Sequence, residues 1–68
     1  MQMGEWKVKP NPLETTWKVI TPEGDVFNLE TSGLAIQLGT KLAQENHGLL
    51  LVYRHDGRVQ ASEDFRLH

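Results

Sequence analysis

Residues 16–30, TWKVITPEGDVFNLE, decide the fold because they hold two short apolar segments joined by a recognisable turn. In residues 21–25, TPEGD, proline suits the second position of a type I turn, and Gly24 supplies the left-handed residue that follows it. This geometry pairs Thr21 with Asp25. If the strands are followed outward from this pair, Val19 lies opposite Phe27 and Trp17 lies opposite Leu29. These four large apolar residues then share one face. The stretch therefore predicts a β-hairpin with one apolar face.

A second alternating segment precedes this hairpin. Residues 5–9, EWKVK, place Trp6 and Val8 on one face and charged side chains on the other. This period of two is typical of a strand. The intervening residues 10–15, PNPLET, contain two prolines that cannot donate ladder hydrogen bonds, so they are predicted to form a loop.

The stretch after the hairpin, residues 30–48, has helical periodicity. Thr31 or Ser32 can cap its start, and Asn46 or Gly48 can form its end. One side of this helix collects small and apolar residues: Leu34, Ala35, Leu38, Gly39, Leu42 and Ala43. We predict that this side packs on the sheet and that Gly39 allows a close approach.

Two strands are predicted after the helix. Residues 49–54, LLLVYR, are apolar on both faces, which indicates a central strand or one with a covered outer face. In residues 54–59, RHDGRV, the pair Asp56-Gly57 predicts a hairpin turn. A two-residue turn and a three-residue turn with a glycine bulge would give different end pairs: Arg54 with Val59, or Tyr53 with Val59. We favour the second, because it pairs two apolar residues.

The order of these segments predicts a single α+β domain over residues 1–68. We expect a small antiparallel sheet with one helix packed on one face, in the order strand, strand, strand, helix, strand, strand. The predicted core consists of residues on the helix-facing side: Trp17, Val19, Phe27, Leu29, Ala35, Leu38 and Leu42.

Composition narrows the function classes. The chain has 68 residues and no cysteine, so disulfides and thiolate zinc sites are excluded. Neither a signal-peptide pattern nor a long apolar run occurs, so we expect a soluble, cytoplasmic protein without membrane contact. The net charge of −2 argues against a general nucleic-acid binder, which usually carries a basic excess.

Catalytic, cofactor and metal sites are not predicted. His55 and Asp56 are neighbours at a turn, and the chain contains no nucleophile motif that they could serve. The three histidines, His47, His55 and His68, lack the spacing of a helical zinc site. We therefore interpret Asp56 and Gly57 as turn residues and expect no enzyme activity.

The chain resembles the small bacterial and phage domains catalogued as domain of unknown function 2188. The similarity covers about residues 6–60 and rests on the order and spacing of short motifs: Val8-x-Pro10, Trp17-x-Val19, Leu29-x-Thr31, Ala35-Ile36, Gly39, Leu42-Ala43, Tyr53 and Asp56-Gly57-Arg58-Val59. This resemblance implies a compact α+β domain and no established activity.

The double-sided apolar strand 49–54 suggests an interaction surface. One helix of about 15 residues shields only one face of such a sheet, and exposed contiguous apolar surface usually marks an interface. Either Leu50 and Val52 or Leu51 and Tyr53 must face away from the helix. We predict a non-enzymatic module that forms a homodimer or binds another protein, for example as a phage-type inhibitor of a host protein.

The predicted interface combines this strand with a lysine rim: Leu50, Leu51, Val52, Tyr53, Lys7, Lys9 and Lys18. The alternative is a nucleic-acid-binding module, in which the lysine-lined sheet face holds a phosphate backbone.

Overall fold

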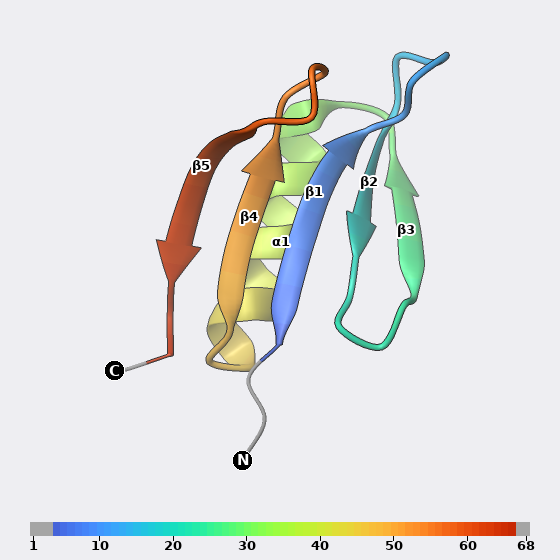
Figure 1. Cartoon of the computed structure of the whole chain (residues 1–68). Helices are drawn as coiled ribbons and strands as arrows, with labels where there is room; N and C mark the ends of the chain where they lie inside the picture. Colours follow the sequence, from blue (N-terminus) through green and yellow to red (C-terminus); the bar gives the residue numbers. More distant parts are fainter. Residues whose placement is uncertain (1–3, 67–68) are drawn as a thin grey trace.

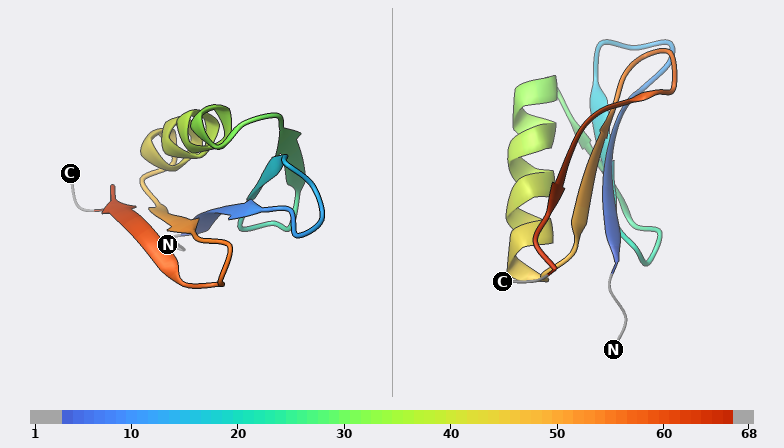
Figure 2. Two further views of the ribbon diagram at one scale, coloured as in Figure 1. Left: turned by 90° about the horizontal axis from the view of Figure 1, so that it is seen from above. Right: turned by 60° about the vertical axis from the view of Figure 1, so that its left-hand side comes forward.

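A computed structural model describes residues 4–66, which form five strands and one helix. The elements follow one another as β1 (Glu5–Pro10), β2 (Trp17–Ile20), β3 (Val26–Leu29), α1 (Ser32–Glu45), β4 (Leu49–Tyr53) and β5 (Val59–Asp64). Across the sheet their order is β3-β2-β1-β4-β5 (Figure 1). Figure 2 shows two layers, with α1 along one face of a twisted sheet. This is an α+β fold with a helix on one face, as predicted.

The sheet is mixed, so the prediction of an antiparallel sheet is wrong. Trp6 lies opposite Leu50, and Val8 opposite Val52, in a parallel pairing of β1 with β4. The cause is the connection through α1. Two hairpins reverse the chain twice, so β3 runs parallel to β1. The helix then returns the chain along the sheet, so β4 starts again in the same direction, as parallel crossovers require.

The hairpin of β2 and β3 has the predicted register. The Thr21 N–H donates to the Asp25 carbonyl at 2.9 Å, and the Gly24 N–H donates to the Thr21 carbonyl at 2.9 Å. Gly24 has a φ of 96°, the left-handed conformation that the turn needs. The predicted partners are all confirmed: Val19 with Phe27, and Trp17 with Leu29.

The hairpin of β4 and β5 has the three-residue turn that we favoured. The Arg54 N–H donates to the Arg58 carbonyl at 2.7 Å, and Gly57 has a φ of 88°. Tyr53 pairs with Val59, and a register shift follows between Val52 and Tyr53. The extra residue is Gln60, between Val59 and Ala61, so β5 carries a β-bulge of its own beside the turn.

The helix meets the sheet through small residues. The hydroxyl of Thr31 caps α1 by accepting the Leu34 N–H at 3.1 Å. Ala35, Gly39 and Ala43 are the buried helical residues. None of the described segments is a helix with the length and hydrophobicity needed to cross a membrane.

The core lies where α1 covers the middle of the sheet. Its buried apolar residues are Trp6, Val8, Val19, Ala35, Ala43, Leu50 and Val52. Four other predicted core residues pack against this cluster while keeping some exposure: Trp17, Leu29, Leu38 and Leu42. The prediction of Phe27 as a core residue is wrong, because its exposed fraction is 46%. Its register is correct, but β3 is an edge strand and α1 leaves much of its inner face uncovered.

Candidate functional site

The face of the sheet opposite α1, called the open face below, is built by simple alternation. Because Trp6 and Val8 of β1 point into the core, Lys7 and Lys9 point away from it. Strand pairing then aligns the outward residues in two rows: Asn28, Lys18, Lys9, Tyr53 and Val59 in the first, and Val26, Ile20, Lys7, Leu51 and Ser62 in the second.

The β4 residues predicted to form the interface divide between the two faces. Leu50 and Val52 have exposed fractions of 3% each and belong to the core, so their assignment to the interface is wrong. Leu51 and Tyr53 face outward and are half-buried. The cause is the register with β1, which places Leu50 beside Trp6 on the helix side.

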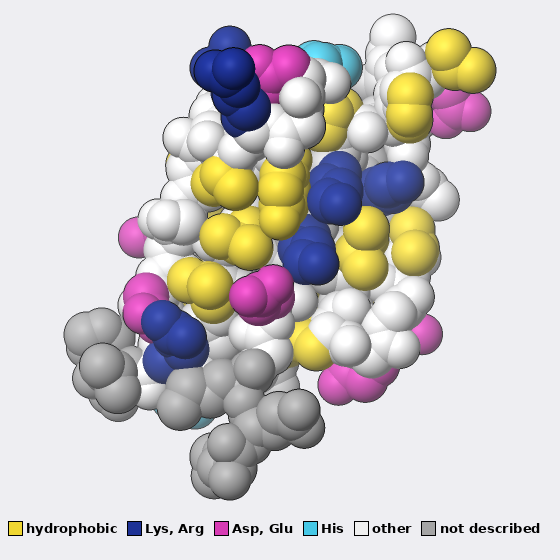
Figure 3. All heavy atoms as spheres, viewed as in Figure 1, with side chains coloured by type: hydrophobic (Ala, Val, Ile, Leu, Met, Phe, Trp, Pro, Cys, Tyr) yellow, Lys and Arg dark blue, Asp and Glu magenta, His cyan; other side chains and the backbone are white. Residues whose placement is uncertain are grey.

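Apolar side chains occupy the open face on both sides of a basic centre. Leu49, Leu51 and Tyr53 form one apolar strip on β4. Ile20 and Val26 form another on β2 and β3, and Val26 is 51% exposed. Figure 3 shows the two hydrophobic areas with Lys and Arg side chains between them.

The basic centre consists of Lys7, Lys9 and Lys18, called the lysine stripe below. These lysines were predicted at the rim, but Lys7 and Lys9 lie on β1, the central strand of the sheet, and Lys18 lies on the neighbouring β2. Lys9 stands directly opposite Lys18, a like-charged cross-strand pair that disfavours folding. None of the three forms an ion pair with any residue of the described range 4–66.

Asp64, at the edge of this face, has a basic partner of its own. The carboxylate of Asp64 accepts hydrogen bonds from the Arg66 side chain at 2.8 and 2.6 Å. This contact raises the pKa of Arg66 above its ordinary value. Asp64 thus pairs with Arg66, at the end of β5.

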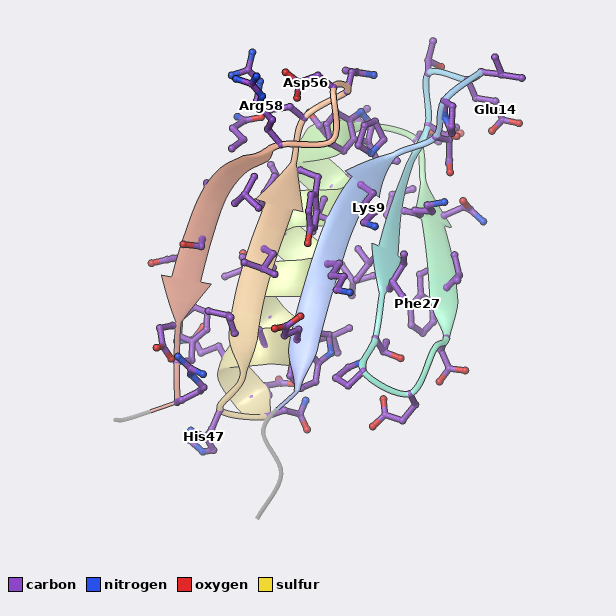
Figure 4. All side chains as sticks on the ribbon, viewed as in Figure 1. Lys9, Glu14, Phe27, His47, Asp56 and Arg58 are labelled. Carbon is purple, nitrogen blue, oxygen red and sulfur yellow. The ribbon has the colours of Figure 1, made fainter. Side chains whose placement is uncertain are left out.

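A shallow cavity of about 340 Å³ lies at one end of the open face and is called the head pocket below. Two loops border it, the β1–β2 loop and the β4–β5 turn (Figure 4). Its lining combines basic, aromatic and proline side chains: Lys9, Pro10, Pro12, Tyr53, Arg54, His55 and Gly57. The ammonium of Lys9 lies 4.8 Å from the centroid of the Tyr53 ring.

The predicted turn role of Asp56 agrees with its contacts. Its Oδ1 accepts the Arg58 N–H at 3.0 Å, which closes the turn around Gly57. His55 is exposed, and its ring meets the Trp17 ring edge-on, with centroids 5.5 Å apart. This contact could not be predicted from local sequence, because Trp17 belongs to a different hairpin.

A larger cavity of about 530 Å³ lies at the opposite end of the sheet. Its polar lining includes Glu5, Glu23 and Lys7. The hydroxyl of Thr21, which also lines it, accepts the Asp25 N–H at 3.1 Å and so serves the turn.

Over residues 4–66, no three His, Cys, Asp or Glu side chains gather as a metal site. His68 lies outside the described residues.

We searched for relatives of this chain among family models, curated proteins and solved structures, and none matches. The resemblance to domain of unknown function 2188 therefore stays a prediction.

The turn interpretation predicts unequal effects at adjacent positions. Gly57→Val is expected to lower the free energy of unfolding by about 1–2 kcal/mol, because a β-branched residue resists the positive φ. His55→Ala should lower it by only about 0.5 kcal/mol, since the side chain is exposed. Urea denaturation of both variants measures the difference. A greater loss for His55→Ala would contradict the turn interpretation.

Proposed function

We propose that this chain is a non-enzymatic interaction module that binds an acidic partner protein through the open face. The observation that carries the proposal is the unpaired lysine stripe between two apolar strips. Full burial of a large exposed apolar side chain contributes about 1.5–3 kcal/mol, and the half-buried Leu51 and Tyr53 gain only part of this benefit in the free chain. A partner with carboxylates between apolar residues would remove both the apolar exposure and the charge repulsion.

The lysine stripe also favours a different protein over a second copy as the partner. A two-fold symmetric contact places the same patch of both copies together. Centred on this face, it would bring Lys7, Lys9 and Lys18 against their own counterparts. Like charges across an interface cost several kcal/mol, which is a large penalty for a small surface. We therefore favour a heterologous complex over the homodimer expected from the sequence.

A complex of standard size would cover a modest share of the molecular surface. A standard interface takes about 800 Å² from each partner. The molecule exposes 4794 Å², so this interface would occupy roughly a sixth of its surface.

Charge reversal in the lysine stripe tests the proposal. The wild-type chain is used to capture partner proteins from lysate, and those that crosslink to the open face are selected. The double variant Lys7→Glu, Lys18→Glu is expected to lose these partners. Affinity for a captured partner should fall at least about tenfold, as for other close interfacial charge pairs. Isothermal titration with the purified partner measures this change.

Lys41→Glu provides the matched control, because Lys41 is an exposed lysine on α1, away from the open face. A second variant, Leu51→Ser with Tyr53→Thr, removes the outward apolar pair and should also weaken binding. Retention of every captured partner by both open-face variants, with the fold intact, would overturn the proposal.

Nucleic-acid binding is the second candidate, favoured by the contact of Lys9 with the Tyr53 ring. Basic grooves with stacking aromatics bind single strands, and such binding weakens steeply with salt. Only Tyr53 offers an aromatic ring in the two rows of the described open face. Titration of random single-stranded DNA and RNA across a salt series separates the candidates. Tight, salt-sensitive binding lost in the Lys7→Glu, Lys18→Glu variant would favour this function over the first.

A further inference from the structure

The head pocket collects basic side chains from two segments that are distant in the sequence. Lys9 comes from the end of β1, whereas Arg54 and His55 follow β4. Its lining contains no carboxylate among the described residues. The nearest acidic partner of Arg54 is Asp56, at 3.9 Å in an exposed pair. Such a pair is weak, so the guanidinium is free to bind a stronger anion.

An apolar surface accompanies these charges. The Tyr53 ring and the rings of Pro10 and Pro12 line the same pocket. Lys9 already lies over the Tyr53 ring, which holds its ammonium beside the cavity. A ligand that fits must therefore combine a negative group with an apolar or planar body.

The backbone of the turn favours a carboxylate over a phosphate. Phosphate sites commonly use several free backbone N–H groups as a cradle. Here three of the five N–H groups of residues 54–58 are already used, because those of Arg54 and Gly57 donate to carbonyls inside the turn and that of Arg58 donates to Asp56. Charge in the head pocket thus comes from side chains, and the planar guanidinium of Arg54 matches the two oxygens of a carboxylate.

We propose that the head pocket binds a carboxylate carried next to an aromatic or apolar group, and that it anchors an acidic residue of the partner protein. This inference rests on the proposed function, because it names the group by which the partner is held. The remainder of the open face then covers the apolar surface around that anchor.

Benzoate is a suitable probe, since it joins a carboxylate to one ring. In two-dimensional NMR titrations we expect saturable shifts of the Tyr53, His55 and Gly57 amides, with a dissociation constant on the order of 1–10 mM. Neutral benzamide, which has the same shape, should bind at least about tenfold more weakly, because the charge-assisted hydrogen bonds are lost. Phenyl phosphate tests the other anion and should bind no more tightly than benzoate.

Three substitutions locate the binding. Lys9→Gln and Arg54→Gln should each weaken benzoate about fivefold to tenfold. Asp56→Asn keeps the oxygen that accepts the Arg58 N–H but removes the competing charge, so binding should tighten about twofold. Lys41→Gln removes one positive charge from α1 and should leave the titration unchanged.

Several outcomes would overturn the inference. They are unsaturated shifts for benzoate, equal affinity for benzamide, preference for phenyl phosphate, or an unchanged affinity in Lys9→Gln and Arg54→Gln. The proposed function is tested separately, by loss of the partner in the Lys7→Glu, Lys18→Glu variant. The benzoate variants change neither of these two lysines. Partner capture without benzoate binding would refute the anchor alone, and benzoate binding without face-dependent capture would refute the partner proposal.

Discussion

Gly48→Ala is expected to abolish stable folding of this domain. A Cβ atom at Gly48 would collide with Cζ3 of Trp6 and would lie 2.6 Å from Cε3 of the same ring. It would also lie 2.8 Å from the carbonyl oxygen of Gly4. We expect a loss of about 3 kcal/mol or more, the upper part of the range for overpacking. A single core of this size rarely supplies more than about 3–5 kcal/mol in total.

The surroundings of Gly48 leave little room for relief. Trp6 is only 7% exposed, so its ring is confined by the core. The Gly4 carbonyl accepts the Leu49 N–H at 3.0 Å, and the Gly48 carbonyl accepts the Phe65 N–H at 2.9 Å. A shift of the Gly48 backbone would therefore disturb the junctions of β4 with both of its neighbours.

Urea denaturation followed by circular dichroism measures this effect. Gly33→Ala is the matched control, because its new Cβ would meet nothing nearer than the Thr31 hydroxyl at 3.9 Å. Alanine in the first turn of α1 should preserve or raise stability, by up to about 1 kcal/mol. Equal denaturation midpoints for the two variants would show that Trp6 does not fill the space at Gly48.

The turn residues made the β2–β3 and β4–β5 hairpins predictable from the sequence. In residues 21–25 and 54–58 the glycine at positive φ and the residues before it determine the turn, and the turn determines the register. The parallel pairing of β1 with β4 had no such signal, since it depends on where the chain arrives after α1. Alternation likewise identified the face of Phe27 but not how far the helix extends over an edge strand.

The candidate site was only partly predictable for the same reason. Strand 49–53 is apolar at every position, so its pattern could not show whether Leu50 or Leu51 faces the helix. Lys7 and Lys9 were assigned correctly to the outer side by alternation. That Lys7 and Lys9 lie at the centre of the face could not be predicted without the order of the strands in the sheet. The head pocket joins two loops about 40 residues apart, and neither loop indicates a binding site by itself.

Val8→Ala is expected to have the second largest effect on stability. Val8 is fully buried on the central strand, under Gly39 of the helix. Loss of two methyl groups there should lower the free energy of unfolding by about 2–3 kcal/mol, from lost burial and the remaining cavity. Val26→Ala deletes the same atoms from a side chain that is 51% exposed and should cost about 0.5 kcal/mol.

Val8 packs directly against Gly39 of α1, and a substitution at Gly39 tests this contact. Gly39→Ala alone would place a Cβ 2.8 Å from Cγ2 of Val8 and 3.1 Å from Cδ1 of Leu50. That crowding opposes the gain of about 1 kcal/mol that alanine brings to a helix interior.

In the Val8→Ala background the nearest of these atoms is absent, so the same Gly39→Ala change should raise stability by about 1 kcal/mol. Urea denaturation of the wild type, the two single variants and the double variant gives the coupling energy between the two positions. We expect it to be at least about 1 kcal/mol, as for residues in direct contact. Additive effects would mean that the helix and sheet adjust independently, and that the absence of a side chain at Gly39 is not what lets Val8 pack beneath α1.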